Sequence, residues 1–149
     1  MSIRNLDSLF DPASIAVIGA SQRVGSLGAT VWRNLTHGDY GGRLFAVNLK
    51  HRELDGHPVY AHARSLPEIP ALAVICTPPA TVPDLIKELA ELGTGAAVVM
   101  TAGMNPEQKQ AMLAAARPHL LRILGPNCLG LQRPQLKLKP QTSPTLRPW

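Results

Sequence analysis

The residues best suited to chemistry lie at positions 14–28, which read SIAVIGASQRVGSLG. A short apolar run, typical of a buried parallel strand, leads into a turn rich in glycine and serine and then into apolar residues at helical spacing. This arrangement points free backbone N–H groups and the positive end of a helix dipole at an anion. Gly19, Gly25 and Gly28 allow backbone conformations and close approaches that a Cβ atom would obstruct. The sequence therefore predicts a site for a phosphate-bearing ligand.

This loop matches neither of two common phosphate-binding fingerprints. The dinucleotide pattern G-x-G-x-x-G fails because Ser21 stands at its second glycine. The pattern G-x-x-x-x-G-K-[ST] fails because Ser26 follows Gly25. The glycines would also suit tight packing of a strand against a helix, with no ligand involved. On its own, the loop indicates a nucleotide-like ligand whose identity stays open.

The elements that must position this loop are indicated by apolar runs at 15–18, 44–47, 72–76, 96–100 and 121–124. These runs alternate with helical patterns, which predicts an α/β fold: a Rossmann-like, doubly wound parallel sheet of about five strands in three α/β/α layers. In such sheets, ligands bind beyond the carboxyl ends of the strands. The chemically interesting residues expected at those ends are Ser21, Asn48, Lys50, Thr77, Pro78, Pro79, Thr101, Ala102, Gly103 and Asn127.

Local signals predict where the helices begin and what the polar segment 51–70 does. Thr81, followed by Asp84, is expected to cap one helix in a capping-box arrangement. Asn105 is expected to cap the next, with Pro106 at its first position. The polar segment predicts a loop with one short extended piece and a partial helical turn. The last helix is expected to turn inward Met112, Leu113, Ala116 and Leu120.

The composition predicts one domain at residues 1–131 and a basic, proline-rich tail at 132–149 that is disordered or loosely attached. The tail holds four of the 15 lysines and arginines, which leaves 11 basic residues against 10 acidic ones elsewhere. The net charge of +5 therefore does not indicate a nucleic-acid partner. Neither a membrane span nor a signal peptide is predicted, so we expect a cytoplasmic protein. Cys76 and Cys128 lack C-x-x-C spacing and are interpreted as small buried hydrophobes, and no metal site is predicted.

The residues after the second expected strand bear on which nucleotide would bind. An NAD site places an acidic residue there to hold the ribose hydroxyls. This sequence has Asn48 and Lys50 instead, with Arg52 close behind. Bases without an acid suit a ligand with an additional phosphate near its ribose, either coenzyme A or NADP. A solvated loop would have the same composition.

Five motifs in consistent order over about residues 5–131 resemble one family, the N-terminal CoA-binding domain of NDP-forming acyl-CoA synthetases. That family includes ADP-forming acetate–CoA ligase and the succinyl-CoA synthetase α subunit, and a similar domain opens bacterial protein lysine acetyltransferases. The motifs are S-I-A-V-I-G-A-S at 14–21, the W-R-N-L segment at 32–35, V-N-L-K at 47–50, A-V-I-C-T-P at 73–78 and G-P-N-C-L-G at 125–130.

The resemblance implies that coenzyme A or an acyl-CoA is the ligand. It implies that Ser21, Gln22 and Arg23 contact the CoA phosphates at the first helix, with Lys50 near the nucleotide phosphates. Residues 77–79 would pack along the adenine or pantetheine, residues 101–103 would line the thiol end, and Asn127 would lie near the reactive centre. The full set of expected cofactor-binding residues is Gly19, Ser21, Gln22, Arg23, Gly25, Asn48, Lys50, Thr77, Pro78, Pro79, Thr101, Ala102, Gly103 and Asn127.

The chain also departs from this family. Members continue after G-P-N-C-L-G into a domain with a phosphorylated histidine, and often into an ATP-grasp domain. None of the histidines at 37, 51, 57, 62 and 119 matches that position, so no catalytic residue is predicted. We expect a truncated CoA-binding module of an acyl-CoA ligase that is inactive alone, with an ATP-grasp subunit or domain as the candidate partner. The alternatives are a CoA-sensing regulatory domain of an acetyltransferase and an unrelated NADP- or nucleotide-binding protein.

Overall fold

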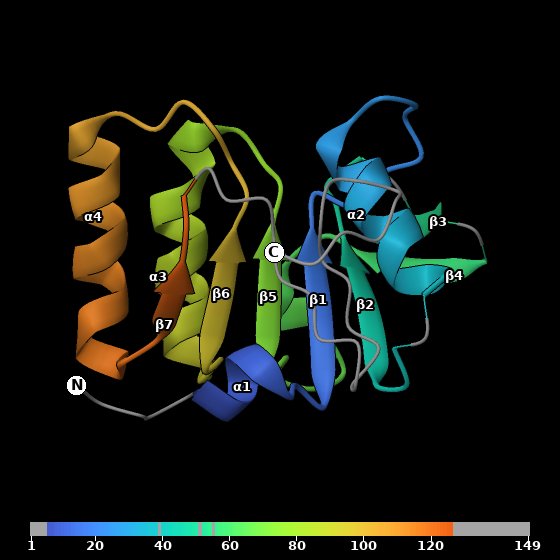
Figure 1. Cartoon of the computed structure of the whole chain (residues 1–149), viewed down its shortest axis with the longest axis horizontal. Helices are drawn as coiled ribbons and strands as arrows, with labels where there is room; N and C mark the ends of the chain where they lie inside the picture. The colour runs from blue at the N-terminus through green and yellow to red at the C-terminus, as the bar shows by residue number, and fades with distance from the viewer. Residues whose placement is uncertain (1–5, 39, 51, 55, 127–149) are drawn as a thin grey trace.

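The computed structural model describes residues 6–38, 40–50, 52–54 and 56–126. Within them, one sheet runs in the order β3-β4-β2-β1-β5-β6-β7 (Figure 1). Neighbouring strands are parallel, apart from the antiparallel pair β3–β4. The predicted Rossmann-like, doubly wound fold is confirmed. The strands are β1 (Ser14–Ile18), β2 (Arg43–Val47), β3 (Glu53–Leu54), β4 (His57–Tyr60), β5 (Leu72–Ile75), β6 (Ala96–Val99) and β7 (Arg122–Leu124).

Helices cover both faces of this sheet, which gives two hydrophobic cores. On one face α2 (Leu27–Thr36) packs Trp32 and Leu35 against the sheet, in a core that includes Val17 of β1. On the other face α3 (Val82–Leu92) and α4 (Pro106–Ala116) pack together, and Ile86 belongs to a core that includes Ile75 of β5. The short α1 (Leu6–Phe10) contacts β6 (Figure 1). Burial on both faces explains why β5, β6 and, after Ser14, β1 are continuously apolar in sequence.

The sheet has more strands than the expected five, because the polar segment 51–70 contributes β3 and β4. β4 extends the sheet in parallel beside β2, where Val59 lies opposite Ala46. β3 then folds back antiparallel, with Glu53 opposite Pro58. Strands at a sheet edge are partly solvated and tolerate proline, so they lack the apolar run that marks a central strand. The last strand begins at Arg122, one residue later than expected.

Of the local expectations, the Asn105 cap is confirmed, the Thr81 cap is wrong, and the inward-facing set of the last helix is right for Met112 and Ala116 only. Asn105 forms a full capping box with Gln108, with hydrogen bonds of 2.7 and 2.9 Å. Thr81 does not cap α3, because it already has helical dihedrals at the end of the 3₁₀ turn η2 (Pro79–Thr81). Leu113 and Leu120 are half exposed rather than inward-facing. The chain leaves α4 through the 3₁₀ turn η3 (Arg117–His119), which shifts the phase and buries Leu121 instead.

Asn127 and the tail at 132–149 lie outside the described residues. Among the described ones, no helix combines the length and the apolar character that crossing a bilayer requires.

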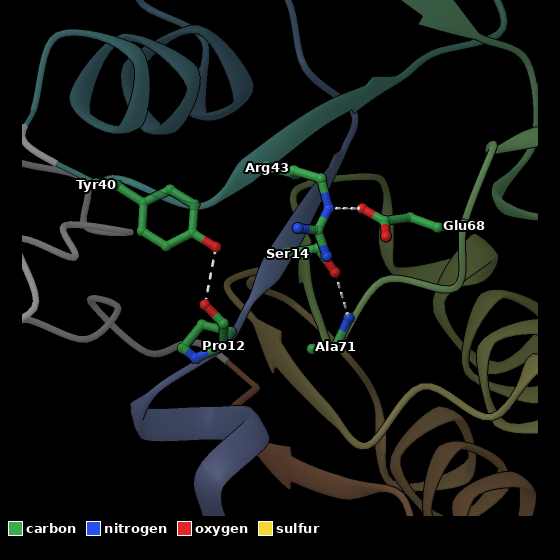
Figure 2. A network of polar contacts seen from close by, with 6 residues as sticks. All are labelled: Pro12, Ser14, Tyr40, Arg43, Glu68 and Ala71. Atoms are coloured by element: carbon green, nitrogen blue, oxygen red, sulfur yellow. Dashed lines mark hydrogen bonds and ion pairs between the residues drawn. The ribbon is translucent and has the colours of Figure 1, made fainter.

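A polar network joins the amino ends of the strands, opposite the expected ligand site (Figure 2). The Tyr40 hydroxyl donates to the carbonyl oxygen of Pro12 at 2.9 Å. Arg43, at the start of β2, forms an ion pair with Glu68. The backbone N–H of Ala71 donates to Oγ of Ser14 at 3.0 Å. These bonds tie the segments that enter β1, β2 and β5 to one another.

The Tyr40 hydroxyl should make stability depend on pH at high pH. Burial raises its pKa to about 12, although Arg43 opposes the shift. The unfolded chain therefore ionises first, near pH 10, so the stabilising effect is fully present below pH 10 and is lost as the pH rises through 12. We expect the stability difference between the wild type and Tyr40→Phe to change over this interval and to be constant from pH 7 to 9. Urea unfolding of both proteins measures it. Parallel curves up to pH 12 would mean that the hydroxyl is not shielded.

Candidate ligand-binding site

The loops that leave β1, β2, β5 and β6 meet at the carboxyl edge of the sheet (Figure 1). The backbone N–H of Gly19 donates to the carbonyl oxygen of Val47 at 2.8 Å, which joins the ends of β1 and β2. The N–H of Cys76 donates to the carbonyl oxygen of Ile18 at 2.9 Å, which joins the ends of β5 and β1. The expected cofactor-binding residues that the structure describes lie on these four loops. The parallel topology therefore brings them to one edge.

The three glycines of the first loop have different roles. A Cβ atom on Gly28, in the first turn of α2, would lie 1.9 Å from the carbonyl oxygen of Gly19. Gly19 itself has φ +93°, and its Cβ would lie 3.1 Å from the backbone of Cys76. These two glycines serve the close packing of helix against strand. Gly25 has φ +83°, but nothing lies within 4 Å of its Cβ position. It faces open space, where a ligand can approach the backbone.

Serine side chains hold the first loop in shape. Oγ of Ser21 accepts from the N–H of Arg23 at 3.0 Å. Ser26 caps α2 by accepting from the N–H of Ala29 at 3.2 Å, and its hydroxyl donates to the carbonyl oxygen of Arg23 at 2.7 Å. Sequence reasoning did not identify Ser26, although a serine directly before a helical pattern is a recognised cap signal. The loop is thus pre-shaped at the positive end of α2.

Three cationic side chains reach the solvent on these loops. Arg23 is exposed in the first loop together with Gln22, and Lys50 and Arg52 are exposed after β2. The residue after the end of β2 is Asn48 and not an acid. Its side-chain Oδ1 accepts from the backbone N–H of Lys50 at 2.8 Å. The same side chain donates from Nδ2 to the carbonyl oxygen of Ala20 at 2.8 Å. The charge at this edge suits an anionic ligand.

The loops after β5 and β6 lie side by side. Thr101 is buried, and its hydroxyl donates to the carbonyl oxygen of Thr77 at 2.8 Å. A Cβ atom on Gly103 would lie 3.9 Å from Cγ of Pro79. The Thr81 hydroxyl donates to the hydroxyl oxygen of Thr77 at 2.7 Å. Thr81 therefore joins this loop together instead of capping α3. Pro78 and Ala102 are exposed on the same loops. This part of the edge offers neutral hydroxyl, carbonyl and apolar groups.

Among the described residues, no group of three or more His, Cys, Asp or Glu side chains could hold a metal ion. Asn127, the residue expected nearest a reactive centre, lies outside them. What the described residues bring together is a glycine- and serine-rich loop at the N-terminus of α2, three cationic side chains and a neutral wall.

Comparison with known proteins agrees with this description. A family model described as a CoA binding domain matches residues 13–134. A trans-feruloyl-CoA synthase from an unknown prokaryotic organism is 40% identical over 135 residues, which is 87% of this chain and 19% of that protein. The α subunit of an ADP-forming acetate–CoA ligase from Pyrococcus furiosus is 31% identical, over 95% of this chain and 33% of the subunit.

A solved structure has a similar fold over most of the chain. The dinucleotide-forming acetyl-coenzyme A synthetase 1 of Ca. Korarchaeum cryptofilum, in complex with phosphate and ADP, superposes with a TM-score of 0.89 and 31% identity. The match covers 93% of this chain and 31% of the synthetase chain. This chain thus spans between a fifth and a third of the length of these relatives.

Proposed function

This chain belongs to the CoA binding domain family, and on that premise we propose that the carboxyl edge of its sheet binds coenzyme A or an acyl-CoA. One observation supports this assignment over an NAD site. The position after β2 that would carry an acid in an NAD site is taken by Asn48, with Lys50 exposed beside it. A lysine there would attract a ligand with an additional phosphate, as coenzyme A has.

The parts of the ligand are assigned by the character of each loop. We propose that Ser21, Gln22, Arg23 and the backbone at Gly25 meet the phosphates at the N-terminus of α2. Lys50 would lie near the nucleotide phosphates. Residues 77–79 would pack along the adenine or pantetheine, residues 101–103 would line the thiol end, and Asn127 would lie near the reactive centre.

In its biological context, we propose that the chain is the CoA-binding module of an ADP-forming acid–CoA ligase. The relatives named above are CoA ligases or synthases, and this chain matches only part of each. A phosphorylated histidine and an ATP-grasp unit would then be supplied by other domains or a partner subunit. We therefore expect no ligase activity from these 149 residues alone.

Ligand-dependent stabilisation tests the proposal directly. Coenzyme A at 100 times its Kd should stabilise the fold by about 2.7 kcal/mol, and NAD at the same concentration should have a smaller effect. Thermal unfolding with coenzyme A, acetyl-CoA, NADP and NAD separates the candidates. A larger rise in Tm with NAD or NADP than with coenzyme A would overturn the assignment.

Lys50→Ala is expected to weaken coenzyme A binding about tenfold, because one charge-assisted contact is worth about 1–2 kcal/mol. The unfolding free energy should stay within about 0.5 kcal/mol of wild type, since Lys50 is exposed. If Lys50 meets the 3′-phosphate, its replacement should have less effect on dephospho-CoA. Lys87→Ala, which removes an exposed lysine of α3, is the matched control. Equal affinities of the two variants in calorimetric titration would contradict a role for Lys50.

A further inference from the structure

Asn48, one of the expected cofactor-binding residues, makes two side-chain hydrogen bonds within the protein. Nδ2 donates to the carbonyl oxygen of Ala20, and Oδ1 accepts from the N–H of Lys50, both at 2.8 Å. These partners fix the orientation of the amide, because reversing it would place Oδ1 against a carbonyl oxygen and Nδ2 against an N–H. The Asn48 side chain thus uses one donor hydrogen and one acceptor site within the protein, without any ligand.

The Asn48 bonds begin where the backbone pairing of β1 and β2 ends. Ile18 lies opposite Val47 in the last register pair, and the N–H of Gly19 donates to Val47 at 2.8 Å. One residue further on, the Asn48 side chain takes over by reaching Ala20. The backbone N–H of Asn48 donates to the carbonyl oxygen of Tyr60 at 2.9 Å, which anchors it to β4. Asn48 is therefore held by the sheet and in turn holds two loops.

The two loops held by Asn48 carry the groups that the proposed function assigns to phosphate binding. On one side, Ala20 precedes Ser21 and the turn that contains Gly25. On the other side, the bond from the N–H of Lys50 to Oδ1 of Asn48 forms an Asx turn, which fixes the position of the Lys50 backbone. Loops that are already ordered pay less entropy when a ligand binds.

We propose that Asn48 is a positioning residue: it clamps the glycine loop to the Lys50 turn, so that loop backbone and lysine ammonium meet one phosphate-bearing ligand. The proposal rests on the proposed function for its ligand, but the clamp itself exists in the free protein. Two substitutions of Asn48 distinguish its hydrogen bond to Ala20 from its hydrogen bond with Lys50. Asn48→Asp keeps the acceptor for the Lys50 N–H but, when ionised, cannot donate to Ala20. Asn48→Ala loses both hydrogen bonds.

Hydrogen exchange of the ligand-free protein at neutral pH tests the clamp without coenzyme A. In Asn48→Ala, we expect the amides of Arg23, Ser26 and Lys50 to exchange about tenfold faster, while Met100 at the end of β6 is unchanged. In Asn48→Asp, the amides of Arg23 and Ser26 should speed up while Lys50 stays protected. Uniform acceleration that includes Met100 would indicate a merely global effect and overturn the proposal. Unchanged exchange of Arg23 and Ser26 would do the same.

Tyr40→Phe is a closely matched control for these variants. It also removes one side-chain donor to a carbonyl oxygen 28 residues away, as Asn48 to Ala20 does. That bond lies at the amino edge of the sheet (Figure 2), so its loss should leave the exchange of Arg23, Ser26 and Lys50 as in the wild type. Acceleration of these amides in Tyr40→Phe would overturn the local interpretation.

Calorimetric titration then separates positioning from direct ligand contact. Asn48→Ala should weaken coenzyme A binding about tenfold, and by less than about threefold when introduced into Lys50→Ala, because part of its effect acts through Lys50. The full tenfold loss in both backgrounds would show that Asn48 does not act through Lys50 and would overturn the proposed clamp between the glycine loop and the lysine. If the wild type does not bind coenzyme A, the proposed function fails, whereas the exchange results still decide whether the clamp exists.

Discussion

Replacing Gly28 with alanine is expected to destabilise the domain by about 3 kcal/mol or more. The added Cβ atom would lie 1.9 Å from the carbonyl oxygen and 2.9 Å from the carbonyl carbon of Gly19. Both are backbone atoms at the end of the central strand β1, so α2 must move away from the sheet. Overpacking in a core costs about 1–3 kcal/mol and occasionally more, and here no flexible side chain can yield. The gain of about 1 kcal/mol in helix propensity from glycine to alanine is too small to offset this.

Urea unfolding of Gly28→Ala beside Gly41→Ala measures the effect. Nothing lies within 4 Å of the Cβ position of Gly41, so its replacement should change the unfolding free energy by less than about 1 kcal/mol. If Gly28→Ala were as stable as the wild type, close packing of helix on strand would not explain this glycine.

Gly25→Val is expected to reduce coenzyme A affinity about 100-fold, equivalent to about 2.7 kcal/mol, while the protein stays folded. No atom lies within 4 Å of the Cβ position, so the free protein has room for the side chain. The branched side chain would occupy the space through which a phosphate approaches the loop backbone. At φ +83° the backbone is also strained by a side chain, at about 1–2 kcal/mol of stability.

Gly56→Val is the control that distinguishes backbone strain at positive φ from steric blocking of the ligand. Gly56 has φ +81° and nothing within 4 Å of its Cβ position, and it lies in the β3–β4 hairpin. Both variants should therefore lose similar stability, but only Gly25→Val should lose affinity, measured by calorimetry at a temperature where both are folded. Wild-type affinity in Gly25→Val would mean that the phosphates bind elsewhere along the carboxyl edge.

The roles of Gly25 and Gly28 could not be distinguished from the sequence. In the sequence, Gly25 and Gly28 are alike: two glycines of one turn, compatible with either packing or ligand approach. Their surroundings differ because Gly28 faces the carbonyl oxygen of Gly19, whereas Gly25 faces no atom. That difference depends on how α2 lies on β1, which is not a local property of the turn.

Elements whose signals are local or strongly periodic could be predicted from the amino-acid sequence. β5, β6 and the part of β1 after Ser14 are apolar because a parallel strand is buried on both faces. α4 begins where the side chains of Asn105 and Gln108 each accept from the other's backbone N–H. Alternation of strands and helices then implies a parallel sheet, and a parallel sheet brings its carboxyl ends to one edge. This is why the loops of the candidate site could be named before their contacts were known.

Features that depend on partners distant in sequence could not be predicted and became clear from the three-dimensional fold. β4 is a strand because β2 offers it an edge, and its own half-polar residues gave no strong signal. Thr81 bonds to Thr77 instead of capping α3, since a 3₁₀ turn had already brought it into helical dihedrals. The Asn48 side chain donates to the carbonyl oxygen of Ala20, 28 residues away, a contact that the sequence did not indicate. A hydrogen bond between loops depends on where the strands place both ends, and no pattern of neighbouring residues encodes that position.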